Sequence, residues 1–215
     1  MGFISPFPKK HHPLQEKAAR FSEIYRSYLA RGVPENGGRD AHITIIARSA
    51  FSPVCRMLCS LAGEFEERGV TAQVILAAPG PVEIMRHMFD AARRMNGRAA
   101  IAASFRWAQN PSLLDAHEQM TLGAASVWTG DCMRRSADNR NGLDLFEPDS
   151  LGSVRLADLA FSAMWMASRP LPPELLEAAN ASGDSMAGVD AVTIAEALCR
   201  VPPRSAEIVP LRAAG

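Results

Sequence analysis

The fold is decided by residues 41–78, which read AHITIIARSAFSPVCRMLCSLAGEFEERGVTAQVILAA. Residues 41–47 form a nearly continuous β-branched and apolar run, which is typical of a strand covered on both faces. Pro53 then marks the first turn of a one-sided helix that ends at Gly69. A second apolar strand, residues 70–77, follows at once. The stretch therefore predicts a strand–helix–strand unit.

The same rhythm continues beyond this unit. Residues 82–96 place apolar side chains at the 3.6-residue period of a helix, and residues 98–105 are interpreted as a third strand. Because parallel neighbouring strands need a crossover about as long as a helix, the pattern predicts three parallel strands in a βαβαβ arrangement. An amphipathic helix over residues 14–31 precedes the first strand.

The pattern changes after Trp107. Residues 118–122 and 126–130 are two extended runs around Gly123, which predicts a hairpin, and residues 134–149 are interpreted as a polar loop. Two C-terminal helices are expected. The first, residues 154–168, is apolar enough to be largely buried. The second covers residues 189–200, and the prolines between the two indicate connectors.

These elements give an α/β fold with three parallel strands, a hairpin, an N-terminal helix and C-terminal helices. The expected organisation is an N-terminal arm and helix in residues 1–40 and an α/β core in residues 41–150. Residues 151–215 then form a helical extension packed on that core. A chain of 215 residues fits one such unit without disulfides or metals to hold it together.

Composition excludes several classes of protein. Lys plus Arg and Asp plus Glu are both 23, so no overall charge draws the chain to nucleic acid or to an acidic membrane surface. No window approaches the roughly 20 apolar residues of a membrane span. The first ten residues do not have the charge order of a secretory signal, so a cytoplasmic protein is the simplest expectation. The four cysteines lack zinc-knuckle or redox spacing, and no metal or cofactor is predicted.

Ligands of an open parallel sheet bind beyond the carboxyl ends of its strands. Arg48 and Ser49 stand at the end of the first strand, just before a helix begins, so they are candidates to bind an anion. Arg134 could add a second cation to a local anion patch. Without a glycine-rich phosphate loop in the sequence, a nucleotide is not specifically indicated.

The most informative stretch runs from His117 to Asp131. It resembles the hairpin of the phospholipase D superfamily, in which His-x-Lys is followed after four residues by Asp, and then by a glycine beside a small polar residue. His117 matches the histidine, and Gly130 lies one residue early for the glycine. The resemblance covers about residues 41–147. It implies a histidine nucleophile that attacks a phosphodiester held by the lysine.

The departures from this pattern are chemical. Gln119 replaces the lysine, Ala124 the aspartate, and Asp131 the small polar residue that binds phosphate. Phosphoryl transfer needs cationic donors directed at the phosphate oxygens, and a carboxylate there repels them. The resemblance therefore implies a non-catalytic relative that acts as a homodimer or binds another protein, since single-motif members of that family build their site across a dimer.

An enzyme remains the alternative. Adjacent strand residues point to opposite faces, so His117 and Gln119 can share a site that Glu118 cannot easily join. Across the hairpin, His117 can pair with Asp131 as catalytic residues of a phosphate-ester or small-molecule enzyme, with Arg48 or Arg134 binding the substrate. A His–Asp pair can equally be a structural hydrogen bond. The reach between His117 and the strand-end loops would distinguish these readings.

Overall fold

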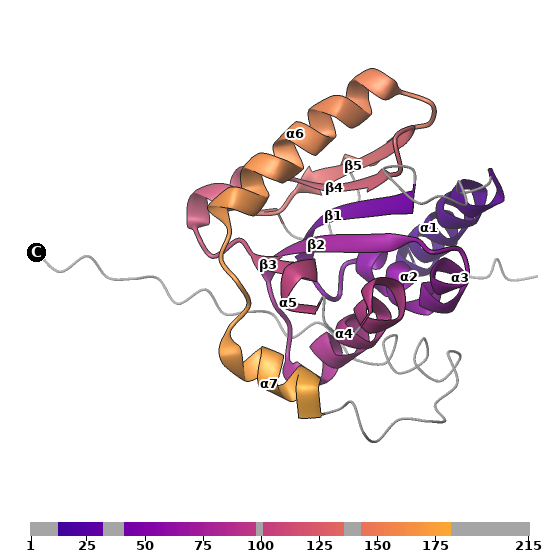
Figure 1. Ribbon diagram of the computed structural model, residues 1–215. Coiled ribbons are helices and arrows are strands. Elements are labelled where there is room, and N and C mark those ends of the chain that lie inside the picture. The colour runs from indigo at the N-terminus through magenta and orange to yellow at the C-terminus, as the bar shows by residue number, and fades with distance from the viewer. Residues whose placement is uncertain (1–12, 32–40, 98–100, 136–142, 182–215) are drawn as a thin grey trace, which may run out of the picture.

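The structure is a computed structural model that describes residues 13–31, 41–97, 101–135 and 143–181. Six strands form one sheet with helices on both faces (Figure 1). The strands are β1 (His42–Ser49), β2 (Thr71–Ala78), β3 (Phe105–Trp107), β4 (His117–Leu122), β5 (Ser126–Cys132) and β6 (Leu145–Glu147). The helices are α1 (Pro13–Ala30), α2 (Pro53–Ser60), α3 (Ala62–Glu66), α4 (Val82–Asn96), α5 (Ile101–Ser104), the 3₁₀ helix η3 (Pro111–Asp115), α6 (Leu151–Ala167) and α7 (Pro173–Ala181).

The strand order is β3-β2-β1-β4-β5-β6, and β1, β2 and β3 are parallel neighbours. This confirms the predicted α/β class and its parallel half. The predicted hairpin is present as β4 and β5, and β4 pairs antiparallel with β1. Gly123 has a φ of 58° in the turn of the hairpin, a backbone conformation that favours glycine.

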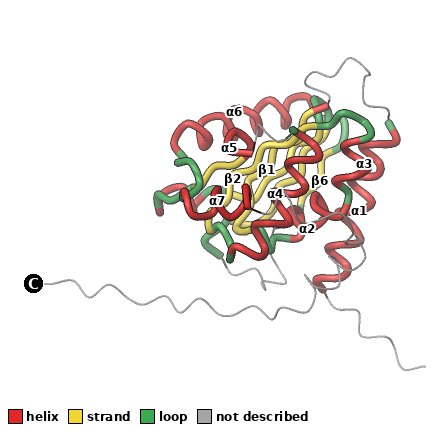
Figure 2. The backbone as a smooth tube through the Cα atoms, turned by 60° about the horizontal axis from the view of Figure 1, so that its bottom comes forward, coloured by secondary structure: helices red, strands yellow, loops and turns green. Residues whose placement is uncertain are grey.

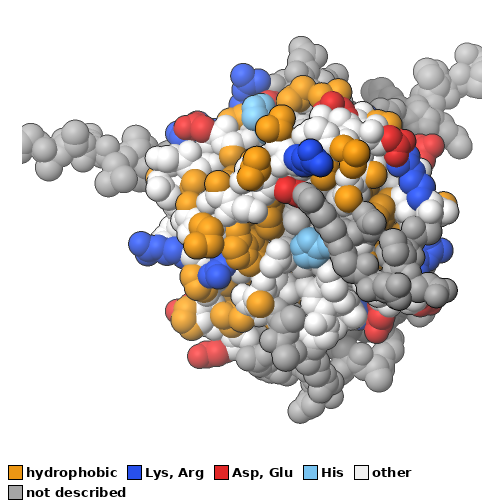
Figure 3. Space-filling model, turned by 45° about the horizontal axis from the view of Figure 1, so that its top comes forward, with side chains coloured by type: hydrophobic (Ala, Val, Ile, Leu, Met, Phe, Trp, Pro, Cys, Tyr) orange, Lys and Arg blue, Asp and Glu red, His pale blue; other side chains and the backbone are white. Residues whose placement is uncertain are grey.

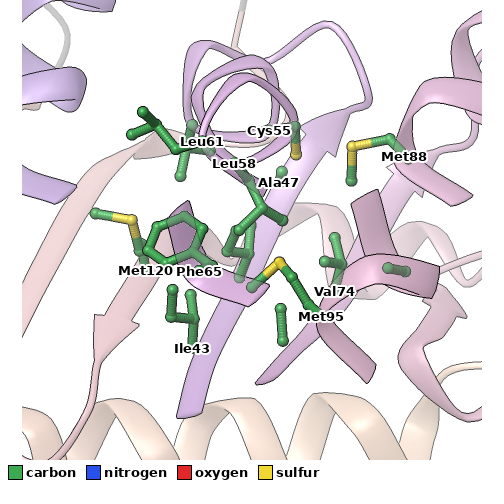
Figure 4. Packing of buried hydrophobic residues seen from close by; sticks show 14 of the residues in the cluster. Ile43, Ala47, Cys55, Leu58, Leu61, Phe65, Val74, Met88, Met95 and Met120 are labelled. Atoms are coloured by element: carbon green, nitrogen blue, oxygen red, sulfur yellow. The ribbon is translucent and has the colours of Figure 1, made fainter. Parts of the chain in front are cut away.

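Helices cover the two faces of the sheet unequally (Figure 2). Ile43 and Ile45 of β1 point into the larger core, which α1, α2, α3 and α4 close. Figure 4 shows part of this core, where Phe65 of α3 lies among methionines and β-branched side chains. Ile46 points to the other face, where its buried partners include Phe161 and Met164 of α6. The β-branched run is therefore covered on both sides, as its composition predicts.

The N-terminal helix is joined to the far end of the sheet. Phe21 of α1 meets the ring of Trp128 on β5 edge to face, with centroids 4.8 Å apart. The carboxylate of Asp144 accepts hydrogen bonds from Trp128 Nε1 and from Arg20 Nη1, each 2.7 Å long. This one side chain thus links α1, β5 and the segment that enters β6.

Two predictions about strands are corrected. The expected third strand is present, but its predicted bounds are wrong at residues 101–104, because Ile101–Ser104 is a helical turn and β3 begins at Phe105. Alanine favours helix over strand, and it dominates this stretch. β6, only three residues long, lies in the segment expected to be a polar loop.

Three predictions about helices are corrected as well. The helix after Pro53 is interrupted at Leu61, which separates α2 from α3. α7 occupies part of the expected connector and packs against α4. The expected burial of residues 154–168 holds for one side of α6 and is wrong for the other, which is exposed. The expected helix over residues 189–200 lies outside the described residues. Among the helices that are described, none is long and apolar enough to span a membrane.

Candidate functional site

The strand ends named by the sequence gather at one edge of the sheet. β1 and β2 are parallel and end at Ser49 and Ala78. β4 runs antiparallel to β1, so it begins at this edge with His117, and β5 returns there to end at Cys132. Arg48, Ser49, His117 and Asp131 thus all lie at the carboxyl edge of the parallel strands, a position that the sequence predicts for Arg48 and Ser49.

His117 is exposed and its ring is oriented by the backbone. Its Nδ1 lies 2.9 Å from the carbonyl oxygen of Gly130, and a carbonyl only accepts, so Nδ1 carries the proton. This tautomer leaves Nε2 at the exposed side of the ring. In the ladder His117 stands opposite Cys132, next to an irregularity between His117 and Gln119.

Asp131 is the residue before Cys132, which stands opposite His117 in the ladder. Its carboxylate interacts with Cys132 and Arg135. Its Oδ1 accepts the backbone N–H of Cys132 at 2.9 Å and lies 3.3 Å from Nη1 of Arg135. The side chain is only 11% exposed. These bonds hold the carboxylate at the end of β5, and a catalytic pairing of His117 with Asp131 stays a prediction.

Glu118 occupies the place that the sequence assigns to a bound anion. It is buried, and its Oε1 accepts the Ser52 hydroxyl at 2.7 Å and the backbone N–H of Arg48 at 3.0 Å. Its Oε2 lies 3.7 Å from Nη2 of Arg48. Ser52 is the residue before α2, so the chain's own carboxylate sits at the start of that helix.

The other residues of the predicted anion site have partners within the chain. Arg48 donates from Nε to the carbonyl of Met133 at 3.0 Å and from Nη2 to that of Cys132 at 3.1 Å. The hydroxyl of Ser49 accepts the N–H of Phe51 at 3.2 Å. Arg48 and Ser49 therefore stabilise the segments at the strand ends through hydrogen bonds to the backbone.

Arg134 is likewise engaged, although it is exposed. Its Nε donates to Oδ1 of Asp115 at 2.7 Å, and its Nη2 donates to the carbonyl of Pro111 at 3.0 Å. The side chain of Arg134 is 55% exposed, so water screens this ion pair and the pair is readily exchanged for other partners. Of the predicted cations, Arg134 is the more accessible to an external anion.

Gln119 points to the face opposite Glu118. Its Nε2 donates to the carbonyl oxygen of Ala157 in α6 at 2.9 Å. The side chain that stands where the resemblance expects a lysine is thus hydrogen-bonded to the helix that covers this face. Glu118 and Met120 point to the α2 face instead, so the predicted alternation of sides along β4 is present.

Gly130 has a packing role that its sequence match did not suggest. A Cβ built at this position would lie 2.3 Å from Cη2 of Trp128 and 3.2 Å from the Cβ of Glu118. The indole of Trp128 therefore lies over the glycine, and any side chain would displace it. Steric exclusion by Trp128 is sufficient to account for the glycine.

The cysteines of the described residues are free thiols, and two of them lie in the core. Burial, with Cys59 and Glu118 nearby, raises the pKa of Cys55 well above its usual value. Burial next to Asp90 raises the pKa of Cys59 to about 12. Both thiols are protonated at neutral pH, which agrees with their predicted role as small apolar side chains. Within the described part of the chain, no three His, Cys, Asp or Glu side chains are grouped to hold a metal ion.

Sequence reasoning missed what Glu118 and Gln119 do. Their partners, Ser52 and Ala157, are 66 and 38 residues away, so no local pattern announces them. One local signal could have indicated the role of Glu118. It shares a strand face with apolar residues, so it is expected to be buried, and a buried carboxylate needs a hydrogen-bonding partner. No protein-family model matches the chain, and no curated protein matches it significantly.

Proposed function

We propose that the chain is a non-catalytic α/β interaction domain of the phospholipase D-like kind, which works in the cytoplasm by associating with a protein partner. The observation that carries the proposal is the hydrogen bond from Gln119 to the carbonyl of Ala157. A phosphodiesterase of that kind needs a cation at this position. Here the position holds a neutral amide that fastens α6 to the sheet.

The charges at the strand-end edge support the same proposal. A phosphoryl-transfer site needs free donors for a dianionic transition state. Arg48 is turned onto backbone carbonyls and onto Glu118, which already supplies a negative charge at the start of α2. A second anion there would be repelled by the first.

The surface also favours a binding function. A shallow, open depression is lined by residues of α1, and none of its lining residues comes from the strand ends. Exposed apolar side chains instead gather on the face that carries α6 (Figure 3). Large exposed apolar patches on a protein surface mark sites of interaction with other molecules.

The proposal is tested by phosphodiester hydrolysis. Wild type, His117→Ala and, as a matched control, His87→Ala are incubated with bis(p-nitrophenyl) phosphate, and nitrophenol release is followed. His87 lies on α4, away from the strand ends. All three proteins are expected to release nitrophenol at the background rate. Turnover by wild type and His87→Ala that is lost in His117→Ala would overturn the proposal.

The same measurement addresses the second candidate, a phosphate-ester or small-molecule enzyme that uses His117 and Asp131. The orientation of His117 favours it, because the Gly130 carbonyl fixes Nδ1 and leaves Nε2 at the exposed edge. A histidine held in this way can act as a base or nucleophile. Arg134 would then exchange Asp115 for the substrate anion.

A further inference from the structure

α6 carries an apolar stripe on each of two sides. The inner stripe faces the sheet and is buried: Val154, Ala157, Phe161 and Met164. The outer stripe has the same spacing two residues further along: Leu156, Leu159, Ala163 and Met166. At 3.6 residues per turn a shift of two residues is about 200°, so the stripes lie on opposite sides of the helix.

The outer stripe is strongly exposed. Leu156, Leu159 and Met166 are 70%, 68% and 84% accessible. A helix that is apolar all round is normally buried all round. The sequence accordingly predicts burial for this helix, and the single chain meets that prediction on one side only.

We propose that the outer stripe of α6 pairs with the same stripe of a second copy of this chain, with the two helices antiparallel and related by a twofold axis. This inference rests on the proposed function and names its partner and its surface. In a twofold interface each contact occurs twice, so a surface that binds itself must be complementary to its own reversed copy.

The order of large and small residues has this complementarity. When two copies run antiparallel about a point midway between Leu159 and Ala163, each Leu159 faces the Ala163 of the other copy. Leu156 and Met166 then face each other at both ends. A large residue opposite a small one at the centre lets the helix axes approach closely. A parallel pair would set Leu159 against Leu159 and leave the alanines facing a gap.

The charges of α6 permit the same arrangement. Of its 17 residues only Arg155 and Asp158 are charged. In the antiparallel alignment Arg155 lies opposite Ala167 of the other copy, and Asp158 falls at the level of Met164, which is turned toward its own sheet, so no like charges are juxtaposed along the seam. Like-charge contacts are the usual barrier to self-association, and this helix has none at the centre.

The exposed area just reaches what a specific dimer needs. The three large side chains, with Ala160, Ala163 and Ala167 beside them, expose roughly 500 Å² per copy, and a twofold pair would bury roughly 1,000 Å² in total, which is at the lower bound for a stable biological interface. The predicted dimer is therefore one of moderate affinity, which dilution can dissociate.

The decisive experiment is size-exclusion chromatography with light scattering over a range of concentrations. Wild type should run as a dimer at high concentration. Leu159→Glu should raise the dissociation constant by at least about 100-fold, since two charges are buried per dimer. Leu145→Glu is the matched control, because Leu145 is an exposed leucine on β6 and is 47% accessible. It should leave the dissociation constant unchanged.

The orientation is tested by mixing two variants. Ala163→Lys alone should also weaken the dimer. In an antiparallel pair the glutamate of Leu159→Glu faces the lysine of Ala163→Lys, so an equimolar mixture should recover a heterodimer, whereas a parallel pair would not. Circular dichroism of each variant should match wild type, because the substituted positions are exposed.

Several results would overturn the pairing. These are a wild type that stays monomeric at all concentrations, a Leu159→Glu protein that is folded yet still dimeric, and a mixture without heterodimer. None of them bears on phosphodiester hydrolysis. Conversely, His117-dependent hydrolysis by a chain that pairs through α6 would remove the non-catalytic function and leave the interface standing.

Discussion

The two faces of the sheet are both covered by apolar helices, but these helices differ in how much of their own apolar surface is buried. The face covered by α1 to α4 is sealed, and Leu58 of α2 is 3% exposed there. On the other face α6 buries its inner stripe against the sheet, but the outer side of the helix leaves Leu159 at 68%. Both residues are leucines on apolar helices beside the same strands. The apolar composition of a helix therefore predicts which of its sides are favourably buried. Whether each side is in fact buried depends on how many other elements of the chain pack against the helix.

The largest effect is expected from a substitution in the core closed by α1 to α4. Leu58→Ala should lower the free energy of unfolding by about 2–5 kcal/mol, because it opens a cavity in a closed core. Urea unfolding followed by circular dichroism measures it. A loss below about 1 kcal/mol would mean that this face is far more adaptable than its burial indicates.

The buried carboxylate on the sealed face gives the next effect. Glu118→Ala leaves the Ser52 hydroxyl and the Arg48 N–H without their acceptor, so the free energy of unfolding should fall by about 1–3 kcal/mol. Added phosphate should then raise the melting temperature of this variant more than that of wild type, because the start of α2 is open to an external anion. Equal shifts for both proteins would contradict the internal-anion interpretation.

Gly130 tests the packing of the sealed face from the strand side. Gly130→Ala pushes the Trp128 ring away and should cost about 1–3 kcal/mol of stability in thermal or urea unfolding. Gly152→Ala is the control on α6, where an added Cβ meets nothing within 4 Å. It should be neutral or stabilise by up to about 1 kcal/mol. The comparison fails if both substitutions cost the same.

The smallest effect belongs to the exposed outer side of α6. Leu159→Ala should change the free energy of unfolding by less than about 0.5 kcal/mol, when measured at concentrations where the chain is monomeric. A larger loss under these conditions would show that residues of the same chain cover the stripe.

The sequence predicts the parallel half of the fold because its signals are local. The β-branched run that ends at Ala47, the proline at the start of α2 and the glycine in the hairpin turn each act within a few residues. Where the signal is short or mixed, prediction fails. Ile101–Ser104 is apolar and bounded like a strand yet alanine-rich, and β6 has only three residues.

The candidate site, like the fold, could be predicted from the sequence only in part. The edge at which Arg48 lies follows from the parallel βαβ arrangement. That His117 lies at the same edge depends on the antiparallel pairing of β4 with β1, which the sequence does not predict. The partners of these side chains do not follow. That Glu118 would reach Ser52, and that Gln119 would reach a carbonyl of α6, depends on contacts between segments that only the folded chain brings together.

The linkage made by Asp144 has a consequence for how the chain acquires its structure. Arg20 and Asp144 are 124 residues apart, and Arg31 pairs with Asp149 across 118. α1 therefore docks with its full set of contacts only after the chain has been synthesised through Asp149. Until then the hydrophobic side of α1, including Phe21, has no Trp128 to cover it, so nascent chains halted before this point expose a surface that chaperones recognise.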